Sequence, residues 1–172
     1  DINIFYGENA QGKTNIVEAV WLFSGMKSFR GAKDSELIKR SSDFSKLYIK
    51  FSNSVRENKA EITITNKRSA VLNGVKLPSC VSLIGKFSAV VFSPAFLSVV
   101  ENGPSERRRF IDTALCQIKP SYAGVISEYS KLLKQRNSLL KDVMFESSIL
   151  DILDVIDEKM ADAGDIIVQE RK

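Results

Sequence analysis

Apolar and polar residues alternate with a period of two in two stretches near the middle of the chain, residues 47–51 and 62–64. The turn-rich residues 53–58 lie between them, so the pattern predicts a β-hairpin. A second hairpin is predicted at residues 70–77, because its apolar arms are separated by Asn73-Gly74, the pair preferred in type I′ turns. Together these segments predict an antiparallel meander.

Two further apolar runs predict strands, and a helix is predicted between them. Residues 2–6 form a strand-like run, and residues 87–92 are nearly continuously apolar, which suits a strand covered on both faces. A helix is expected to begin at about Gly12, because apolar residues then recur at three- and four-residue steps and leave Asn15 and Glu18 on the other side. The apolar positions of this helix are Ile16, Val17, Ala19, Val20, Leu22 and Phe23.

The pattern changes at Gly103-Pro104, where the period of two gives way to a three-four spacing. Pro104 suits the first position of a helix, and the residues that follow predict helices only. One apolar stripe consists of Tyr122, Val125, Ile126, Tyr129, Leu132, Leu133, Arg136, Leu140 and Val143, and a second of Ile149, Ile152, Leu153, Ile156, Met160 and Ile167. The sequence therefore predicts an α/β part at residues 1–102 and a helical part at residues 103–172.

Composition narrows the possible chemistry. The chain has 172 residues, 25 basic and 21 acidic, and its pI near 9.0 permits contact with nucleic acid without requiring it. The absence of histidine excludes Ser-His-Asp and Cys-His catalysis within the chain. Cys80 and Cys116 lie far apart in sequence, which indicates reduced thiols rather than a zinc site. No run of about 18 apolar residues and no signal peptide occurs, so we expect no membrane span and a cytoplasmic location.

The strongest chemical motif is Gly7-Glu8-Asn9-Ala10-Gln11-Gly12-Lys13-Thr14, which matches the phosphate-loop pattern G-x-x-x-x-G-K-[ST]. The two glycines let the backbone curl so that consecutive N–H groups point at the phosphates of a nucleotide. Lys13 is expected to reach the β and γ phosphates, and Thr14 to ligate Mg²⁺ through its hydroxyl. The predicted ATP site comprises Gly7, Glu8, Asn9, Ala10, Gln11, Gly12, Lys13, Thr14 and Asn15.

A polar connection bounded by glycines, residues 25–31, follows the first predicted helix. It contains Lys27 and Arg30, which lie close to the phosphate loop in sequence. These cations either add positive charge to the nucleotide site or are solvated loop residues, and the sequence favours neither alternative.

Several segments together carry a more specific pattern than the phosphate loop. They are residues 7–15, Lys27-Ser28-Phe29-Arg30, Phe92-Ser93-Pro94 leading to residues 103–112, and residues 129–137 with Gln135-Arg136-Asn137. These segments cover most of the chain and resemble the RecF family of bacterial recombination mediators. One departure is Ala95-Phe96, where the family has two acidic residues, so any role of those carboxylates near the nucleotide is in doubt.

The resemblance implies part of an ABC-type ATPase head, related to the SMC and Rad50 heads, at residues 1–102 and a helical second lobe at residues 103–172. It implies ATP and Mg²⁺ binding, slow ATP hydrolysis, ATP-dependent dimerisation, and binding to double-stranded DNA and single-strand/double-strand junctions. It also implies cooperation with RecO and RecR to load RecA in gap repair, replication restart and the SOS response. The family's signature and Walker B motifs lie in a C-terminal portion outside this chain, so we expect an inactive N-terminal fragment without catalytic residues.

Arg107, Arg108 and Arg109 are candidates for DNA contact. Successive helical residues point about 100° apart, so the three arginines cannot share one face. They either pair with acids such as Glu106 and Asp112 or brace the interface of the two lobes, or they place one or two cations on DNA.

Other function classes remain open at this stage. The alternative for the phosphate loop is a small-molecule P-loop kinase, which needs a parallel sheet of alternating strands and helices. The two hairpins predicted directly after the first helix favour the ABC-type head instead. The helical half could also act only as a protein interaction module.

Overall fold

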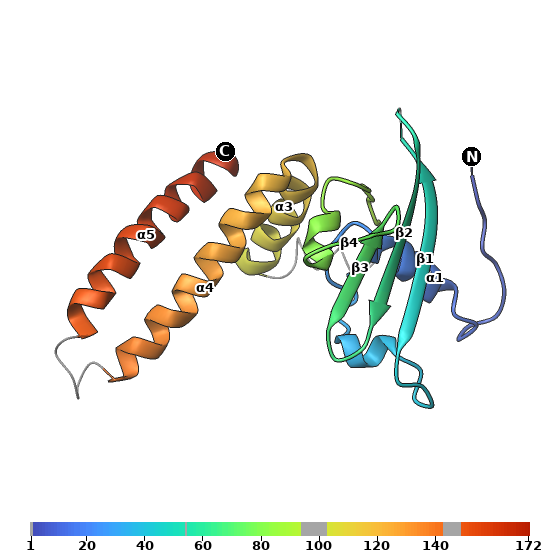
Figure 1. The fold of residues 1–172 in the computed structure, drawn as a ribbon, viewed down its shortest axis with the longest axis horizontal. Coiled ribbons are helices and arrows are strands. Elements are labelled where there is room, and N and C mark those ends of the chain that lie inside the picture. The colour runs from blue at the N-terminus through green and yellow to red at the C-terminus, as the bar shows by residue number, and fades with distance from the viewer. Residues whose placement is uncertain (1, 54, 94–102, 143–148) are drawn as a thin grey trace. The chain divides into compact units, whose positions relative to one another are not determined.

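The computed structural model describes residues 2–53, 55–93, 103–142 and 149–172, and the chain divides into two compact units, Asp1–Gly103 and Pro104–Lys172. The first unit contains a sheet with helices, and the second contains helices (Figure 1). None of the described helices is both long and apolar enough to cross a membrane. The departure at Ala95-Phe96 lies outside the described residues, as do Pro94 and Val143.

An antiparallel sheet forms the centre of the first unit. Its strands are β1 (Ser45–Ser52), β2 (Glu57–Ile64), β3 (Arg68–Leu72) and β4 (Val75–Lys76). They lie in the order β1-β2-β3-β4, with Leu47 opposite Ile62, so that the alternating apolar residues share one face. Asn73 and Gly74 have φ values of 52° and 83°, as a type I′ turn requires. The predicted meander is confirmed.

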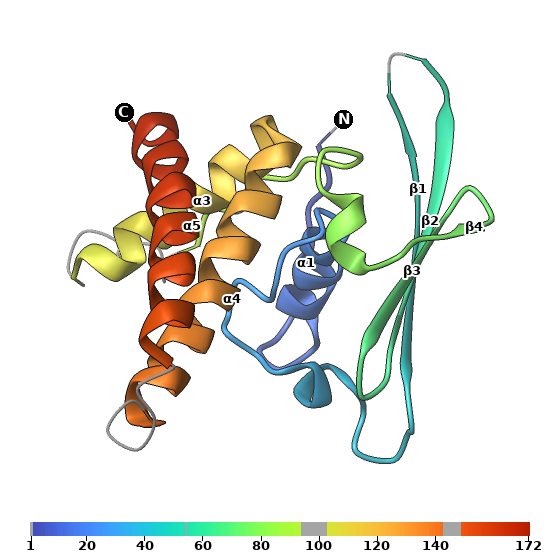
Figure 2. The same ribbon diagram turned by 60° about the vertical axis from the view of Figure 1, so that its left-hand side comes forward.

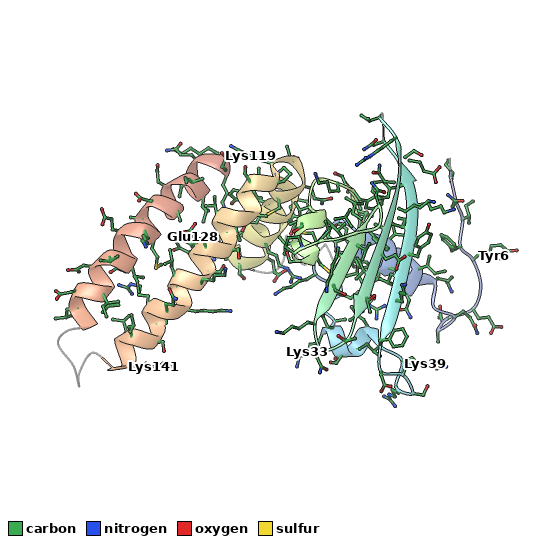
Figure 3. All side chains as sticks on the ribbon, viewed as in Figure 1. Tyr6, Lys33, Lys39, Lys119, Glu128 and Lys141 are labelled. Carbon is green, nitrogen blue, oxygen red and sulfur yellow. The ribbon has the colours of Figure 1, made fainter. Side chains whose placement is uncertain are left out.

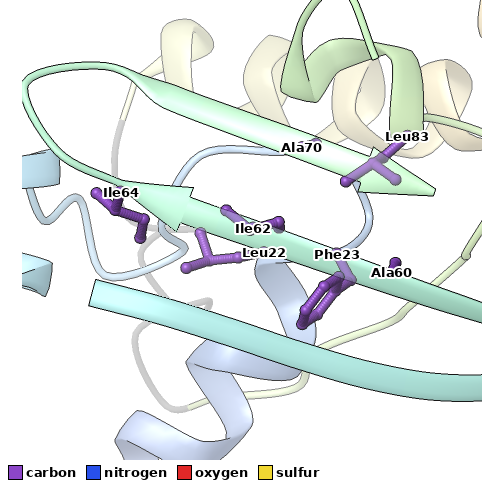
Figure 4. Packing of buried hydrophobic residues seen from close by; sticks show 7 residues of the cluster. All are labelled: Leu22, Phe23, Ala60, Ile62, Ile64, Ala70 and Leu83. Carbon is purple, nitrogen blue, oxygen red and sulfur yellow. The ribbon is translucent and has the colours of Figure 1, made fainter. Parts of the chain in front are cut away.

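The apolar face of the sheet packs against the helix α1 (Lys13–Leu22) and the short 3₁₀ helix η2 (Cys80–Leu83), while η1 (Asp34–Leu37) precedes β1. Helix α1 begins directly after Gly12, as predicted. Phe51 and Phe87 extend the packing edge to face, with ring centroids 5.1 Å apart. Figure 4 shows the buried cluster, which consists of Leu22, Phe23, Ala60, Ile62, Ile64, Ala70 and Leu83.

Two predicted strands are absent. Residues 2–6 and 87–92 form no helix or strand, and most of their apolar side chains are exposed, with Tyr6 at 91% and Val90 at 97%. Tyr6 points away from the sheet (Figure 3). The predictions were wrong because an apolar run forms a strand only where a neighbouring backbone accepts and donates its hydrogen bonds. Neither run belongs to the described sheet.

One residue of α1, Glu18, was wrongly predicted to lie on the polar, exposed side of the helix. Glu18 is buried, at 3% exposure, whereas Ile16, Val17 and Val20 are 41–45% exposed. A carboxylate can be buried when hydrogen bonds and a cation satisfy it, and Ser28 and Arg30 do so here. A hydrophobicity pattern does not reveal partners that lie ten or more residues away.

The second unit contains three described helices, α3 (Pro104–Ile118), α4 (Pro120–Asp142) and α5 (Ile149–Glu170). Pro104 is the first residue of α3, and no strand occurs among the described residues that follow it, as predicted. Helices α4 and α5 lie side by side (Figures 1 and 2). The Arg136 guanidinium donates to Asp157 across them, and this bonding lowers the pKa of the Asp157 carboxyl below its ordinary value.

A polar cluster joins the three helices near the end of α5. Arg171 donates from Nε and Nη2 to the two carboxylate oxygens of Asp112, at 2.8 and 2.7 Å, and the Tyr122 hydroxyl donates to Asp112 at 2.7 Å. Tyr122 is almost fully buried, at 1% exposure. Burial, together with the bond to Asp112 and its negative charge, raises the pKa of Tyr122 to about 12.

We therefore expect the helical unit to lose stability in alkali. The folded state holds the Tyr122 proton more tightly than the unfolded chain, whose tyrosine pKa is about 10. The stabilisation is complete below about pH 10 and is lost as the pH rises towards about 12. Denaturant titrations at pH 9 to 12 should show this loss, and Tyr122→Phe should reduce it. Tyr129→Phe, in the same helix, is the matched control, and equal slopes in both variants would contradict the assignment.

Candidate functional site

The segment before α1 forms a curled loop that opens directly into the helix. Gly7 and Gly12 have φ values of 145° and 83°, and Ala10 has 64°, so the backbone turns sharply at these points. The Gly12 carbonyl accepts bonds from the N–H groups of Asn15 and Ile16, which starts the helical ladder. The first N–H groups of a helix have no partner within it, so the loop and the helix start together offer donors to an anion.

Lys13 lies across this loop. Its ammonium group donates to the carbonyl oxygens of Gly7, at 2.7 Å, and Glu8, at 2.5 Å. The charge is therefore held beside the curled backbone and not extended into solvent. This geometry places a cation where the loop N–H groups and the positive end of the α1 dipole already favour negative charge.

Thr14 follows in the first turn of α1 and is exposed. Its hydroxyl is a hard oxygen ligand of the kind that Mg²⁺ prefers. Among the described residues, no three His, Cys, Asp or Glu side chains gather to form a metal site. A magnesium ion that binds through one or two protein oxygens and nucleotide phosphates fits this donor set.

A buried hydrogen-bond network joins α1 to the connection that follows it. Ser28 donates its hydroxyl to the Glu18 carboxylate and accepts the backbone N–H groups of Arg30, at 3.1 Å, and Ala32, at 3.2 Å. Arg30 Nη1 lies 3.0 Å from Asn15 Oδ1 and 3.5 Å from Glu18 Oε2. The network therefore holds the Arg30 guanidinium against Asn15, the residue that follows Thr14 in the sequence.

Lys27 behaves differently from Arg30. The Lys27 side chain is exposed. Its backbone carbonyl accepts a hydrogen bond from the Trp21 indole N–H at 2.8 Å. Trp21 also contacts Phe29 edge to face, with centroids 6.3 Å apart. Of the two cations in the connection, the structure brings Arg30 to the start of α1.

A cavity of about 820 Å³ adjoins this network in the first unit. Its wall combines polar groups, among them Asn15 and Arg30, with apolar side chains such as Leu22 and Leu47. Small-molecule sites are usually lined mostly by apolar side chains, whereas the wall of this open hollow is mixed and includes several charged residues.

The three candidate arginines lie in α3, in the second unit. All are exposed, and Arg109 Nη1 lies 3.9 Å from Glu106 Oε2 in the same helix. An exposed pair of this kind contributes little to stability. Asp112, the other acid expected to brace them, is bound by Arg171 and Tyr122.

Sequence reasoning missed Glu18 and Ser28, and it left Arg30 undecided. An acid inside an apolar helix is a weak signal of a buried ion pair, and the partner that satisfies it cannot be chosen from the local pattern. The loop itself was found because the spacing of its glycines and lysine is entirely local.

A curled glycine loop that opens into a helix, with a lysine folded across it, defines a P-loop protein of the α/β class. No protein-family model matches the chain. The chain is 42% identical to the DNA replication and repair protein RecF of Acetivibrio thermocellus, over 99% of this chain and 47% of that protein. It is also 42% identical to RecF of Lachnoclostridium phytofermentans, over 98% of this chain and 48% of that protein.

Solved structures give the same result. The recombination mediator protein RecF with ATP, described for the RecFOR pathway, is 38% identical, with a TM-score of 0.90 over 96% of this chain and 45% of that one. The same protein with ATPrS has a TM-score of 0.89. The chain is thus a homologue of RecF, and it spans about half the length of the relatives it matches.

Proposed function

We propose that residues 7–15 form the ATP-binding loop of a RecF-like DNA repair protein. The observation that carries this proposal is the loop geometry, in which Lys13 and the start of α1 converge on one point, in a chain homologous to RecF structures solved with ATP. Lys13 would neutralise the β and γ phosphate oxygens, and Thr14 would ligate Mg²⁺. Arg30, held by Asn15 and Glu18, would add a second cation.

The wider role is proposed for the complete protein, meaning a polypeptide of the length of the RecF relatives. It would bind double-stranded DNA and single-strand/double-strand junctions, dimerise around ATP and hydrolyse it slowly in the cytoplasm. It would act with RecO and RecR to promote RecA loading in gap repair, replication restart and the SOS response. The relatives described as DNA replication and repair proteins, and the RecFOR pathway in which the solved structures are placed, support this proposal.

A small-molecule kinase is the weaker alternative. The sheet that follows α1 is antiparallel throughout its described strands, whereas kinases of this class use a parallel sheet with alternating helices. The homology to RecF also disfavours the kinase. Phosphoryl transfer from ATP to a small acceptor by the complete protein would support it.

The proposal predicts that ATP strengthens DNA binding by the complete protein. If DNA binds mainly the ATP-bound dimer, the two ligands stabilise the same state, and each must raise the affinity for the other by the same factor. Anisotropy of a labelled duplex with a single-stranded tail, measured with and without ATP and Mg²⁺, tests this. Equal DNA affinity under both conditions would contradict the proposed coupling and favour a simple interaction module for the helical part.

The same assay decides the role of Arg107, Arg108 and Arg109. Each is replaced by glutamine in turn, and log affinity is plotted against log salt. A phosphate contact that is lost makes the slope shallower by roughly 0.9. An unchanged slope with lower thermal stability would instead support the bracing role.

A further inference from the structure

The sheet of the first unit has an outer face that no described element of residues 2–93 covers. In Figure 2, α1 and η2 lie on the opposite side of the sheet. Along β1 and β2 each buried or half-buried apolar residue alternates with an outward one. We call the outward set the outer sheet face; it consists of Lys46, Tyr48, Lys50, Ser52, Glu57, Lys59, Glu61, Thr63, Ser69, Val71 and Lys76.

Two lysines on this face, Lys50 and Lys59, have no ion-pair partner among the described residues. Lys50 lies directly opposite Lys59 in the register of β1 and β2, and like charges in that position destabilise a sheet. Lys46, by contrast, pairs with Glu61 at 2.6 Å. Lys76 adds a further cation in β4, and Glu57 is the remaining acid of the face. The opposed pair therefore offers positive charge that an external anion can neutralise.

We propose that the outer sheet face binds the phosphate backbone of DNA, with Lys50 and Lys59 as the principal contacts. This inference rests on the proposed function, because it requires that the complete protein bind DNA. Duplex DNA carries one negative charge per roughly 1.7 Å of helix axis, so a face with several lysines meets several phosphates. Lysine binds phosphate as a mobile point charge and needs no fixed partner geometry.

The composition of the face favours DNA over an acidic protein. Protein interfaces are depleted in lysine at their centre and enriched in arginine and aromatic residues. The outer sheet face has lysines at its centre, no arginine, and Tyr48 as its single aromatic residue. Tyr48 is 52% exposed between Lys46 and Lys50, a position from which its ring can contact a sugar or stack on an unpaired base.

The test uses the complete protein and the labelled duplex with a single-stranded tail. Lys50→Gln and Lys59→Gln are made singly and together, and the dissociation constant is measured across a range of salt concentrations. Each substitution should make the slope of log affinity against log salt shallower by roughly 0.9, and the double variant by about twice that. Lys86→Gln, an exposed lysine outside the sheet, is the matched control and should leave the slope unchanged.

Three results would overturn the inference, and they are distinguishable. If the unaltered protein does not bind DNA, the proposed function itself fails. If the unaltered protein binds DNA but the Lys50 and Lys59 variants show the same slope of log affinity against log salt, the outer sheet face does not contact DNA. The same conclusion holds if these variants keep that slope and lose the binding of a protein partner. If Lys86→Gln reduces the slope equally, the effect reflects net charge alone. Urea unfolding midpoints of the variants should be no lower than that of the unaltered protein, because removing one of two opposed like charges does not destabilise the sheet, and this excludes loss of folding as the cause.

Discussion

Replacing Lys13 by alanine in the complete protein should weaken ATP binding roughly tenfold or more, because charge-assisted hydrogen bonds contribute about 1.5–3 kcal/mol and 1.4 kcal/mol corresponds to a factor of ten. The ammonium group already lies over the loop, bonded to the carbonyl oxygens of Gly7 and Glu8. It can therefore bind phosphate oxygens without a large rearrangement. Calorimetric titration with ATP and Mg²⁺ measures the effect.

Lys67→Ala is the matched control, because Lys67 is an exposed lysine in the turn between β2 and β3. It should bind ATP as the unaltered protein does. Equal affinity for ATP in the Lys13 variant and the control would show that the loop does not hold the phosphates.

Replacing Glu18 by alanine should destabilise the first unit by about 2 kcal/mol, because a buried hydrogen bond to a charged group is lost and its donor is left unsatisfied. Glu18 is 3% exposed and accepts the Ser28 hydroxyl, which in turn binds the backbone N–H groups of Arg30 and Ala32. ATP affinity should fall as well, since Arg30 would lose the carboxylate that holds it near Asn15.

Denaturant unfolding followed by Trp21 fluorescence checks the stability effect, since Trp21 is buried and bonded to Lys27 in the same connection. Glu18→Gln keeps an acceptor for Ser28 and should recover part of the loss. Glu61→Gln, which removes the exposed pair with Lys46, should change stability by less than about 1 kcal/mol. A Glu18→Ala variant as stable as Glu61→Gln would contradict the role assigned to the network.

The parts of the fold that could be predicted are those whose cause is local. Asn73-Gly74 fixes a hairpin because both residues adopt positive φ, and the change of period at Gly103-Pro104 marks the start of α3. Residues 2–6 and 87–92 were predicted as strands from their apolar character alone. A strand depends on a partner backbone, and the sequence of the run says nothing about where that partner lies.

The same distinction applies to the site. The curl of the loop and the position of Lys13 follow from residues within one short segment, and the structure shows both. The buried state of Glu18 depends on Ser28 and Arg30, ten and twelve residues away, so the helical pattern placed it on the wrong side. Arg30 could be placed near the loop only once its bond to Asn15 was known.

A crystal structure of the complete protein with ATP and Mg²⁺ tests the central claim most directly. We expect the phosphates within hydrogen-bonding distance of the N–H groups of residues 7–14, with Mg²⁺ on the Thr14 hydroxyl. Lys13 Nζ should bind β and γ phosphate oxygens in place of the Gly7 and Glu8 carbonyls that it contacts now. A nucleotide bound elsewhere, with Lys13 still on those carbonyls, would contradict the account.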